Sequence, residues 1–158
     1  MTTNSMTAED RLSKLGIHLP EAPTPFGAYV PAVQTGNLLF LSGMLATSGH
    51  TATVVGVVGK NLDVKEGREA AYTATLNVLA LARKQLGSLN RVRHVVRLGV
   101  YVAATTEFID HPKVADAASE LLRDVFGEGT VSSRLVFGVA SLPLGSPVEL
   151  EVIFEVAG

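Results

Sequence analysis

The chain has 158 residues, with no cysteine, no tryptophan and only 18% charged residues. The lack of cysteine excludes a disulfide framework, thiol catalysis and cysteine-ligated metal sites. No apolar run is long enough to span a bilayer. The first residues, Met1-Thr-Thr-Asn-Ser-Met6, contain neither the basic nor the apolar region of a signal peptide. These absences predict a soluble cytoplasmic protein that does not contact membranes.

The chain also lacks a large excess of charge of either sign. The formal net charge is −2, which gives no electrostatic footprint for nucleic acid. Arg91, Arg93 and Arg97 could contact RNA, but the acidic balance favours ordinary solvated charges. The histidines have no ligand-like spacing, so we expect no metal site; they are His18, His50, His94 and His111. We therefore expect neither a nucleic-acid partner nor a metal.

Apolar residues are plentiful by comparison, at 47% of the chain. This is the composition of one globular domain, and we assign residues 1–158 to it. Within the domain, residues 1–25 form an N-terminal extension with a short helix, and residues 26–158 form the core. Few charges remain to cover the surface, which favours burial of apolar surface against a second copy of the chain.

Periodicity predicts the order of elements. Thr7 starts the short helix and Gly16 ends it. A hairpin is expected over residues 28–42, around the turn Gln34-Thr-Gly-Asn37. The remaining elements are strands at 54–58, 92–104, 134–140 and 147–156, and helices at 64–86 and 113–126. We read an α+β fold in which one mixed sheet carries two helices on one face.

Alternation along the last two strands predicts which face each side chain occupies. In the final strand the uniformly apolar set, including Val148 and Leu150, must face the helices, so Glu149 faces away. In the preceding strand the same logic turns Leu135, Phe137 and Val139 inward. Arg134, Val136, Gly138 and Ala140 would then face outward. This predicts Arg134 and Glu149 on the same, outward side of the sheet.

Two interpretations of this charge pair remain open at this stage. One is a solvated or interfacial ion pair, the commoner fate of an Arg and a Glu on adjacent strands. The other is an anion-binding cleft. In it, the planar fork of Arg134 would bind a carboxylate, and Glu149 would hold or deprotonate a water.

Four stretches of the chain resemble the RidA/YjgF family of reactive enamine/imine deaminases. They are Phe26-Gly-Ala-Tyr29, Gly36-Asn-Leu-Leu-Phe-Leu-Ser-Gly43, Ser133-Arg134, and Leu142-Pro143 followed by Val148-Glu-Leu-Glu151. The resemblance implies a chorismate-mutase-like fold and a homotrimer with clefts between subunits. It also implies hydrolysis of 2-imino acids to 2-oxo acids and ammonia, with a small carboxylate as substrate. No cofactor is expected, because an imine is already electrophilic.

The resemblance also implies roles for single residues. Arg134 matches the arginine that binds the substrate carboxylate, and Glu149 matches the glutamate that positions the hydrolytic water. Tyr29 and Ser42 match residues that line the cleft. Val136 stands where the family main chain contacts the ligand.

Several polar positions of the family pattern are replaced in this chain. Val30 and Pro31 follow Tyr29, Met44 follows the Ser-Gly pair, and Ser119 stands in place of an asparagine that would line the cleft. These departures are typical of a longer-chain, divergent subgroup. They leave a second function open, a non-catalytic trimer that binds a small carboxylate or has a regulatory role.

Overall fold

The structure, a computed structural model, describes residues 5–158. Six strands form one mixed sheet in the order β1-β2-β8-β6-β7, with β3 also paired to β8. All pairs are antiparallel except β6 with β7. The strands are β1 Ala32–Thr35, β2 Leu38–Leu41, β3 Met44–Leu45, β6 Val92–Ala103, β7 Ser133–Val139 and β8 Val148–Val156. A separate small hairpin pairs β4 (Thr47–Ser48) with β5 (Thr51–Ala52).

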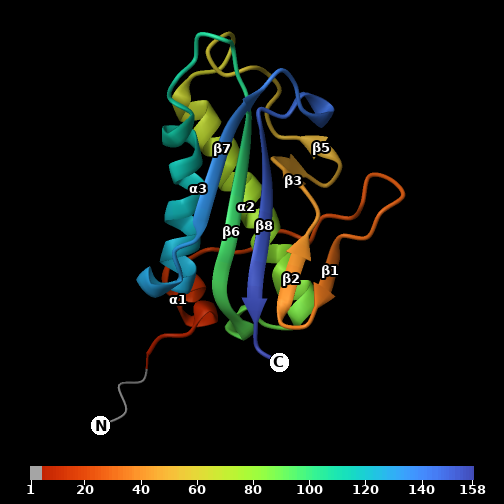
Figure 1. Ribbon diagram of the computed structural model, residues 1–158, viewed down its shortest axis with the longest axis vertical. Coiled ribbons are helices and arrows are strands. Elements are labelled where there is room, and N and C mark those ends of the chain that lie inside the picture. The colour runs from red at the N-terminus through yellow and green to blue at the C-terminus, as the bar shows by residue number, and fades with distance from the viewer. Residues whose placement is uncertain (1–4) are drawn as a thin grey trace.

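Two long helices cover one face of this sheet, as expected (Figure 1). They are α2 (Val64–Leu86) and α3 (His111–Phe126), and the short α1 (Ala8–Lys14) packs against the end of α3. In the described part of the chain no helix covers the opposite face (Figure 1). No helix between residues 5 and 158 is long and apolar enough to cross a bilayer. The predicted α+β architecture is therefore confirmed.

The helix ends follow from local sequence. At the start of α2, Asp63 accepts a hydrogen bond from the backbone N–H of Glu66 at 2.8 Å, and Glu66 accepts one from Asp63 N–H at 3.1 Å. This reciprocal capping satisfies two donors that the first helical turn would otherwise leave unpaired. The helix ends at Gly87, whose φ of 81° lies in the left-handed region that glycine adopts without strain.

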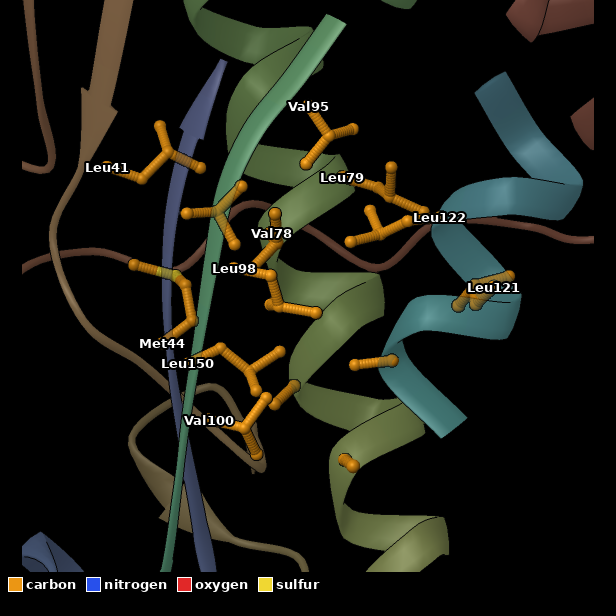
Figure 2. Packing of buried hydrophobic residues seen from close by; sticks show 14 of the residues in the cluster. Leu41, Met44, Val78, Leu79, Val95, Leu98, Val100, Leu121, Leu122 and Leu150 are labelled. Carbon is orange, nitrogen blue, oxygen red and sulfur yellow. The ribbon is translucent and has the colours of Figure 1, made fainter. Parts of the chain in front are cut away.

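The hydrophobic core lies between the sheet and the helices (Figure 2). Leu98 and Val100 of β6, Leu150 of β8 and Val78 of α2 are all fully buried in this layer. Each such side chain stabilises the fold by about 1.5–3 kcal/mol relative to an exposed one. Small alanines along α2 let this helix lie close to the sheet.

The expected strand at residues 54–58 is wrong. This segment is irregular, and its backbone groups find other partners: Val57 N–H donates to the Asn61 side chain at 2.8 Å, and Val58 N–H donates to Ala103 O at 2.8 Å. Gly56 has a φ of 153°, which an L residue rarely adopts. The run of valines buries Val58 in the core, but the segment forms no continuous ladder of β-sheet hydrogen bonds.

Bulges change the inward set of β6. The pairing of β6 with β8 shifts register between Val92 and His94 and again between Val95 and Arg97. Each shift inserts an extra residue and reverses the alternation locally. Val95 is therefore buried with Leu98, whereas Val96 is only partly buried.

Candidate active site

Glu149 lies near the start of β8, on the outward face of the sheet. Burial alternates along this strand: Val148 and Leu150 are fully buried, whereas Glu149 between them is half-buried. Glu149 pairs with Tyr101 of β6, and directly paired residues share a face. The sequence-based placement of Glu149 away from the helices is confirmed.

A cleft of about 610 Å³ opens over Glu149. Two predicted residues, Tyr29 and Ser42, lie in its wall beside the carboxylate. The remaining walls are mainly apolar and come from Phe26, Gly43, Leu45, Pro143 and Leu144. Three segments far apart in the chain therefore meet here: the connector before β1, the residues after β2, and the loop that leads into β8.

Local hydrogen bonds orient the two hydroxyl groups of the cleft. The Tyr29 hydroxyl oxygen accepts a bond from Phe26 N–H at 3.0 Å, so its own hydrogen can be donated to a ligand. Ser42 Oγ donates its hydrogen to Val30 O at 2.7 Å, so its lone pairs remain available as acceptors. The cleft thus offers a donor and an acceptor beside a carboxylate.

Burial raises the pKa of the Glu149 carboxyl above its usual value, because an apolar environment disfavours the charged form. No described residue donates a hydrogen bond to it. Gly43 is packed directly against this group: a Cβ at position 43 would lie 2.5 Å from Glu149 Oε1. A poorly solvated carboxylate with a raised pKa is a stronger base than an ordinary surface glutamate.

Leu144 is the one described non-glycine residue with a positive φ, at 60°. The left-handed conformation costs an L residue about 1–2 kcal/mol. Leu144 stands between Pro143 and Gly145 in a tight turn, and this turn brings it into the cleft wall. The Pro-Leu-Gly sequence was the available signal for such a turn.

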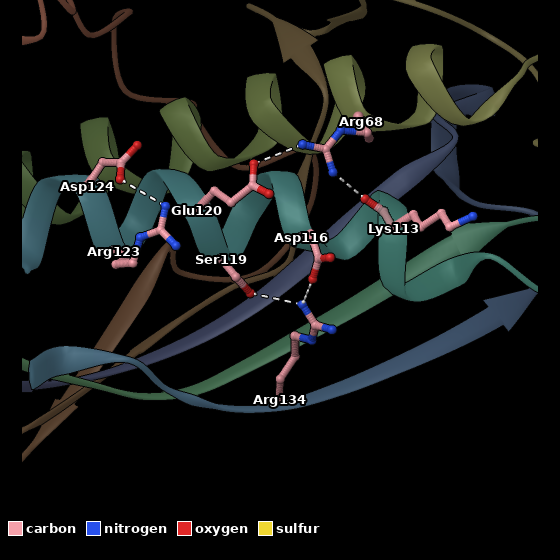
Figure 3. Close-up of polar contacts among 8 residues, drawn as sticks. All are labelled: Arg68, Lys113, Asp116, Ser119, Glu120, Arg123, Asp124 and Arg134. Atoms are coloured by element: carbon pink, nitrogen blue, oxygen red, sulfur yellow. Dashed lines mark hydrogen bonds and ion pairs between the residues drawn. The ribbon is translucent and has the colours of Figure 1, made fainter. Parts of the chain in front are cut away.

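Arg134 lies on β7, on the helical side of the sheet. It pairs with Leu98, whose side chain is fully buried beneath the helices. Its guanidinium reaches α3, where Nη1 donates to Asp116 Oδ1 at 2.7 Å and to Ser119 Oγ at 3.1 Å (Figure 3). The predicted residues Arg134 and Ser119 therefore lie together, and both have Asp116 as a neighbour.

The prediction that Arg134 and Glu149 share one face is wrong. They lie on opposite faces and two strands apart, with Cα atoms separated by roughly 14 Å (about 4.8 Å per strand and 3.3 Å per residue). The inward assignment of Leu135, Phe137 and Val139 is wrong for the same reason. Phe137 pairs with Tyr101 on the outward face and is 51% exposed.

Val136, also predicted to lie at the site, is on β7 with its side chain packed against the core. β7 is an edge strand, so some of its backbone groups face away from the sheet. Sequence reasoning missed Asp116, although its spacing of three from Ser119 places both on one helical face. It also gave no role to Phe26, Pro143 or Leu144.

In residues 5–158 no cluster of three or more His, Cys, Asp or Glu side chains has the arrangement of a metal site. The predicted site residues fall into two separate groups on opposite faces of the sheet. One is the Glu149 cleft with Tyr29 and Ser42. The other, which we call the Arg134 patch, consists of Arg134, Asp116 and Ser119.

A two-layer α+β fold with a mixed sheet beneath two helices defines the class of chorismate-mutase-like proteins. Residues 9–156 match the family model described as "YjgF/chorismate_mutase-like, putative endoribonuclease". The chain belongs to this YjgF/RidA family.

Three similar proteins illustrate the range of the family. Protein TCP17 of Trypanosoma cruzi is 39% identical over 145 residues, 91% of each chain. The 2-iminobutanoate/2-iminopropanoate deaminase of Dermatophagoides farinae is 30% identical and covers 87% of this chain and 92% of its own. The crystal structure of "a putative endoribonuclease" from Shewanella oneidensis has a TM-score of 0.91 at 32% identity, over 96% of this chain and 100% of that one.

Proposed function

We propose that the protein hydrolyses reactive 2-imino acids to 2-oxo acids and ammonia, at a cleft formed between two copies of the chain in a cytoplasmic homotrimer. The observation that carries the proposal is the half-buried Glu149 carboxylate, whose pKa is raised, beside Tyr29 and Ser42. The similarity to a 2-iminobutanoate/2-iminopropanoate deaminase supports the reaction class.

The proposed reaction needs no chemistry beyond proton transfer and water addition. Glu149 takes a proton from a water as its oxygen bonds to C2 of the imine, and the C=N bond becomes a single bond. The protonated Glu149 then returns this proton to nitrogen, which gives the carbinolamine. Glu149 next takes the hydroxyl proton and passes it to the amino nitrogen as the C–N bond breaks, so ammonia leaves and the C–O bond becomes the carbonyl of the 2-oxo acid. Tyr29 can donate to the substrate. Positioning of water and substrate would supply most of the rate gain.

Arg134 is the natural partner for the substrate carboxylate, but it lies on the wrong side of its own sheet to reach the Glu149 cleft. A second copy can supply it. The outward face exposes Val33, Phe40 and Phe137, large apolar side chains whose burial would favour association. We therefore propose that the Arg134 patch of one copy closes the Glu149 cleft of its neighbour.

Mixed oligomers test this arrangement directly. Arg134→Ala and Glu149→Gln should each abolish ammonia release from 2-iminopropionate generated in situ. If the two variants are unfolded together and refolded as an equal mixture, a shared cleft restores about a quarter of wild-type activity. This fraction follows because one site in four combines an intact Arg134 with an intact Glu149. Separately refolded variants, mixed afterwards without exchange, are the control.

The results of this experiment test the shared cleft and the reaction separately. Restored activity supports both the reaction and the shared cleft, whereas inactive mixtures of two folded variants contradict the shared cleft. A wild-type protein no faster than buffer across several imino acids contradicts the reaction itself.

Two observations favour a second function: Asp116 already pairs with Arg134, and the apolar residues Val30, Pro31 and Met44 stand at polar positions of the family pattern. Such a site could hold a small carboxylate without turnover, as a binding or regulatory protein. Calorimetry with 2-oxobutanoate distinguishes the two functions. Binding without imine hydrolysis favours the binding protein, and no binding at all contradicts it.

A further inference from the structure

Leu144 is an unfavourable residue for the turn in which it stands. Its φ of 60° and the φ of 71° at Gly145 place two successive residues in the left-handed region. Ser146 N–H closes the turn by donating to Pro143 O at 3.1 Å. Glycine, asparagine and aspartate are the usual residues at the centre of such a turn, because other side chains are strained there. The turn itself therefore does not explain a leucine at this position.

Burial in the core does not explain Leu144 either. Its side chain is 46% exposed and lies in the wall of the Glu149 cleft. The chain after the turn is fixed, because the buried Ser146 Oγ donates to Val148 O at 2.9 Å. Strained residues persist where the surrounding structure imposes them, and they concentrate at ligand sites. Leu144 is thus a strained residue that presents apolar surface to the cleft.

Phe26 presents a second apolar surface to the same cleft and is also held in place. Its ring stacks on His50, with ring centroids 4.3 Å apart and an angle of 29° between the planes. His50 is fixed in turn, because its Nε2 lies 2.8 Å from Thr24 Oγ1 and 3.1 Å from Thr24 O. The backbone N–H of Phe26 donates to the Tyr29 hydroxyl at 3.0 Å. The ring of Phe26 is therefore positioned before any ligand enters.

The polar groups of the proposed site are already assigned to other parts of a 2-imino acid. Arg134 of a neighbouring copy would hold the carboxylate, and Glu149 would act on the water. Among the described residues that line the cleft, Glu149 is the one charged side chain, and most of the remaining surface is apolar. The cleft volume of about 610 Å³ is in the range of sites for ligands much larger than 2-iminopropionate. The surface left for the side chain of the substrate is therefore apolar and roomy.

We infer that Leu144 and Phe26 make this cleft selective for 2-imino acids with a bulky apolar side chain, such as that of leucine. The inference rests on the function proposed above, because it concerns the same cleft. Both residues would contact the side chain of the substrate rather than its reacting atoms. In the competing arrangement, Leu144 serves only to contact a second copy of the chain.

Hydrolysis of three imines, each generated in situ by an amino-acid oxidase, tests the inference. Alanine and leucine give imines whose side chains differ in size. Asparagine gives an imine of nearly the same shape as that of leucine, but with a polar end. We expect kcat/KM to be at least about tenfold higher for the leucine imine than for either of the others.

Leu144→Asn is the informative variant, because asparagine is similar in size to leucine, is polar and tolerates a positive φ. The ratio of kcat/KM for the leucine imine to that for the alanine imine should fall at least about fivefold. Ile109→Asn makes the same kind of change at an 81% exposed position outside the cleft, and it should leave the ratio unchanged. A general structural defect lowers both rates alike, so the ratio reports on contact with the side chain of the substrate.

The inference is overturned, and the proposed reaction is not, if the wild type hydrolyses the leucine imine no better than either of the others. It is also overturned if Leu144→Asn keeps the wild-type ratio; an altered mass in sedimentation would then assign Leu144 to subunit contact. If no imine is hydrolysed faster than in buffer, the proposed reaction fails, and calorimetry with the matching 2-oxo acids decides the inference alone. Tighter binding of 4-methyl-2-oxopentanoate than of pyruvate supports it, and equal or absent binding overturns it.

Discussion

Gly43→Ala isolates the position of the Glu149 carboxylate from the stability of the fold. Gly43 has no positive φ, so alanine fits its backbone. The added Cβ would lie 2.5 Å from Glu149 Oε1 and 3.1 Å from Cδ. Ordinary contact begins at 3.4 Å, so the carboxylate must move by about 0.9 Å, the difference between 3.4 and 2.5 Å.

A displacement near 1 Å of a group that positions a reactant can cost about 10²-fold in rate, or about 2.7 kcal/mol of barrier. The obstructing atom is the end of a flexible side chain rather than backbone, so the fold can adapt. We expect the free energy of unfolding to change by less than about 1 kcal/mol. The variant should therefore lose about 100-fold in kcat/KM for imine hydrolysis and keep its stability.

The assays are ammonia release from 2-iminopropionate generated in situ and urea unfolding followed by circular dichroism. Gly129→Ala is the matched control, because Gly129 has no positive φ and a Cβ there meets nothing within 4 Å. Wild-type kcat/KM in Gly43→Ala would refute the assignment of Glu149 to the reaction. A loss of stability as large as the loss of activity would refute the claim that the contact is local.

Two further predictions concern the charges of the Glu149 cleft and of the Arg134 patch. Because burial raises the folded-state pKa of Glu149, its ionisation destabilises the fold as pH rises from the unfolded value through the folded one. Glu149→Gln should therefore raise Tm at pH 7 but not below pH ~4, and the wild-type rate should rise with pH through the raised pKa. A Tm gain that is independent of pH would contradict this. Asp116→Asn removes the anion that competes for Arg134; the pair is partly exposed and worth about 1 kcal/mol or less. Affinity for 2-oxobutanoate by calorimetry should rise up to about fivefold, whereas Asp124→Asn, which breaks the separate pair with Arg123, should leave it unchanged.

The sequence predicted β8 correctly and β7 incorrectly for a physical reason. In β8 one alternating set is wholly apolar and the other carries three glutamates, and only one orientation buries no charge. In β7 both sets contain apolar residues. The strand lies at the edge of the sheet, where neither face is fully buried, and its burial pattern barely alternates. Which side chains of such a strand face the helices is decided by the register of its pairing with β6. The residues of β7 alone do not indicate that register.

The candidate site also has a part that the sequence predicted and a part that it did not. Tyr29, Ser42 and Glu149 were predicted by resemblance to a family pattern, and they do share a cleft. The rest of that cleft is built by a turn at Leu144 and a close approach at Gly43, which depend on backbone geometry rather than on residue type. The contact of Arg134 with Asp116 joins an edge strand to a helix, and no periodicity within either element predicts it.

The positions of Arg134 and Glu149 on opposite faces of the sheet limit the roles that the two residues can have together. An ion pair between them within one chain is excluded by roughly 14 Å and by the sheet itself. Each is nevertheless placed to act: Arg134 lies at an open edge with Ser119 beside it, and Glu149 lies in a cleft without a cation of its own. A carboxylate substrate at Glu149 would be repelled unless a positive charge came from elsewhere. In the proposed assembly a second copy of the chain would provide such a charge without any change to the fold, so association and chemistry would depend on the same exposed face.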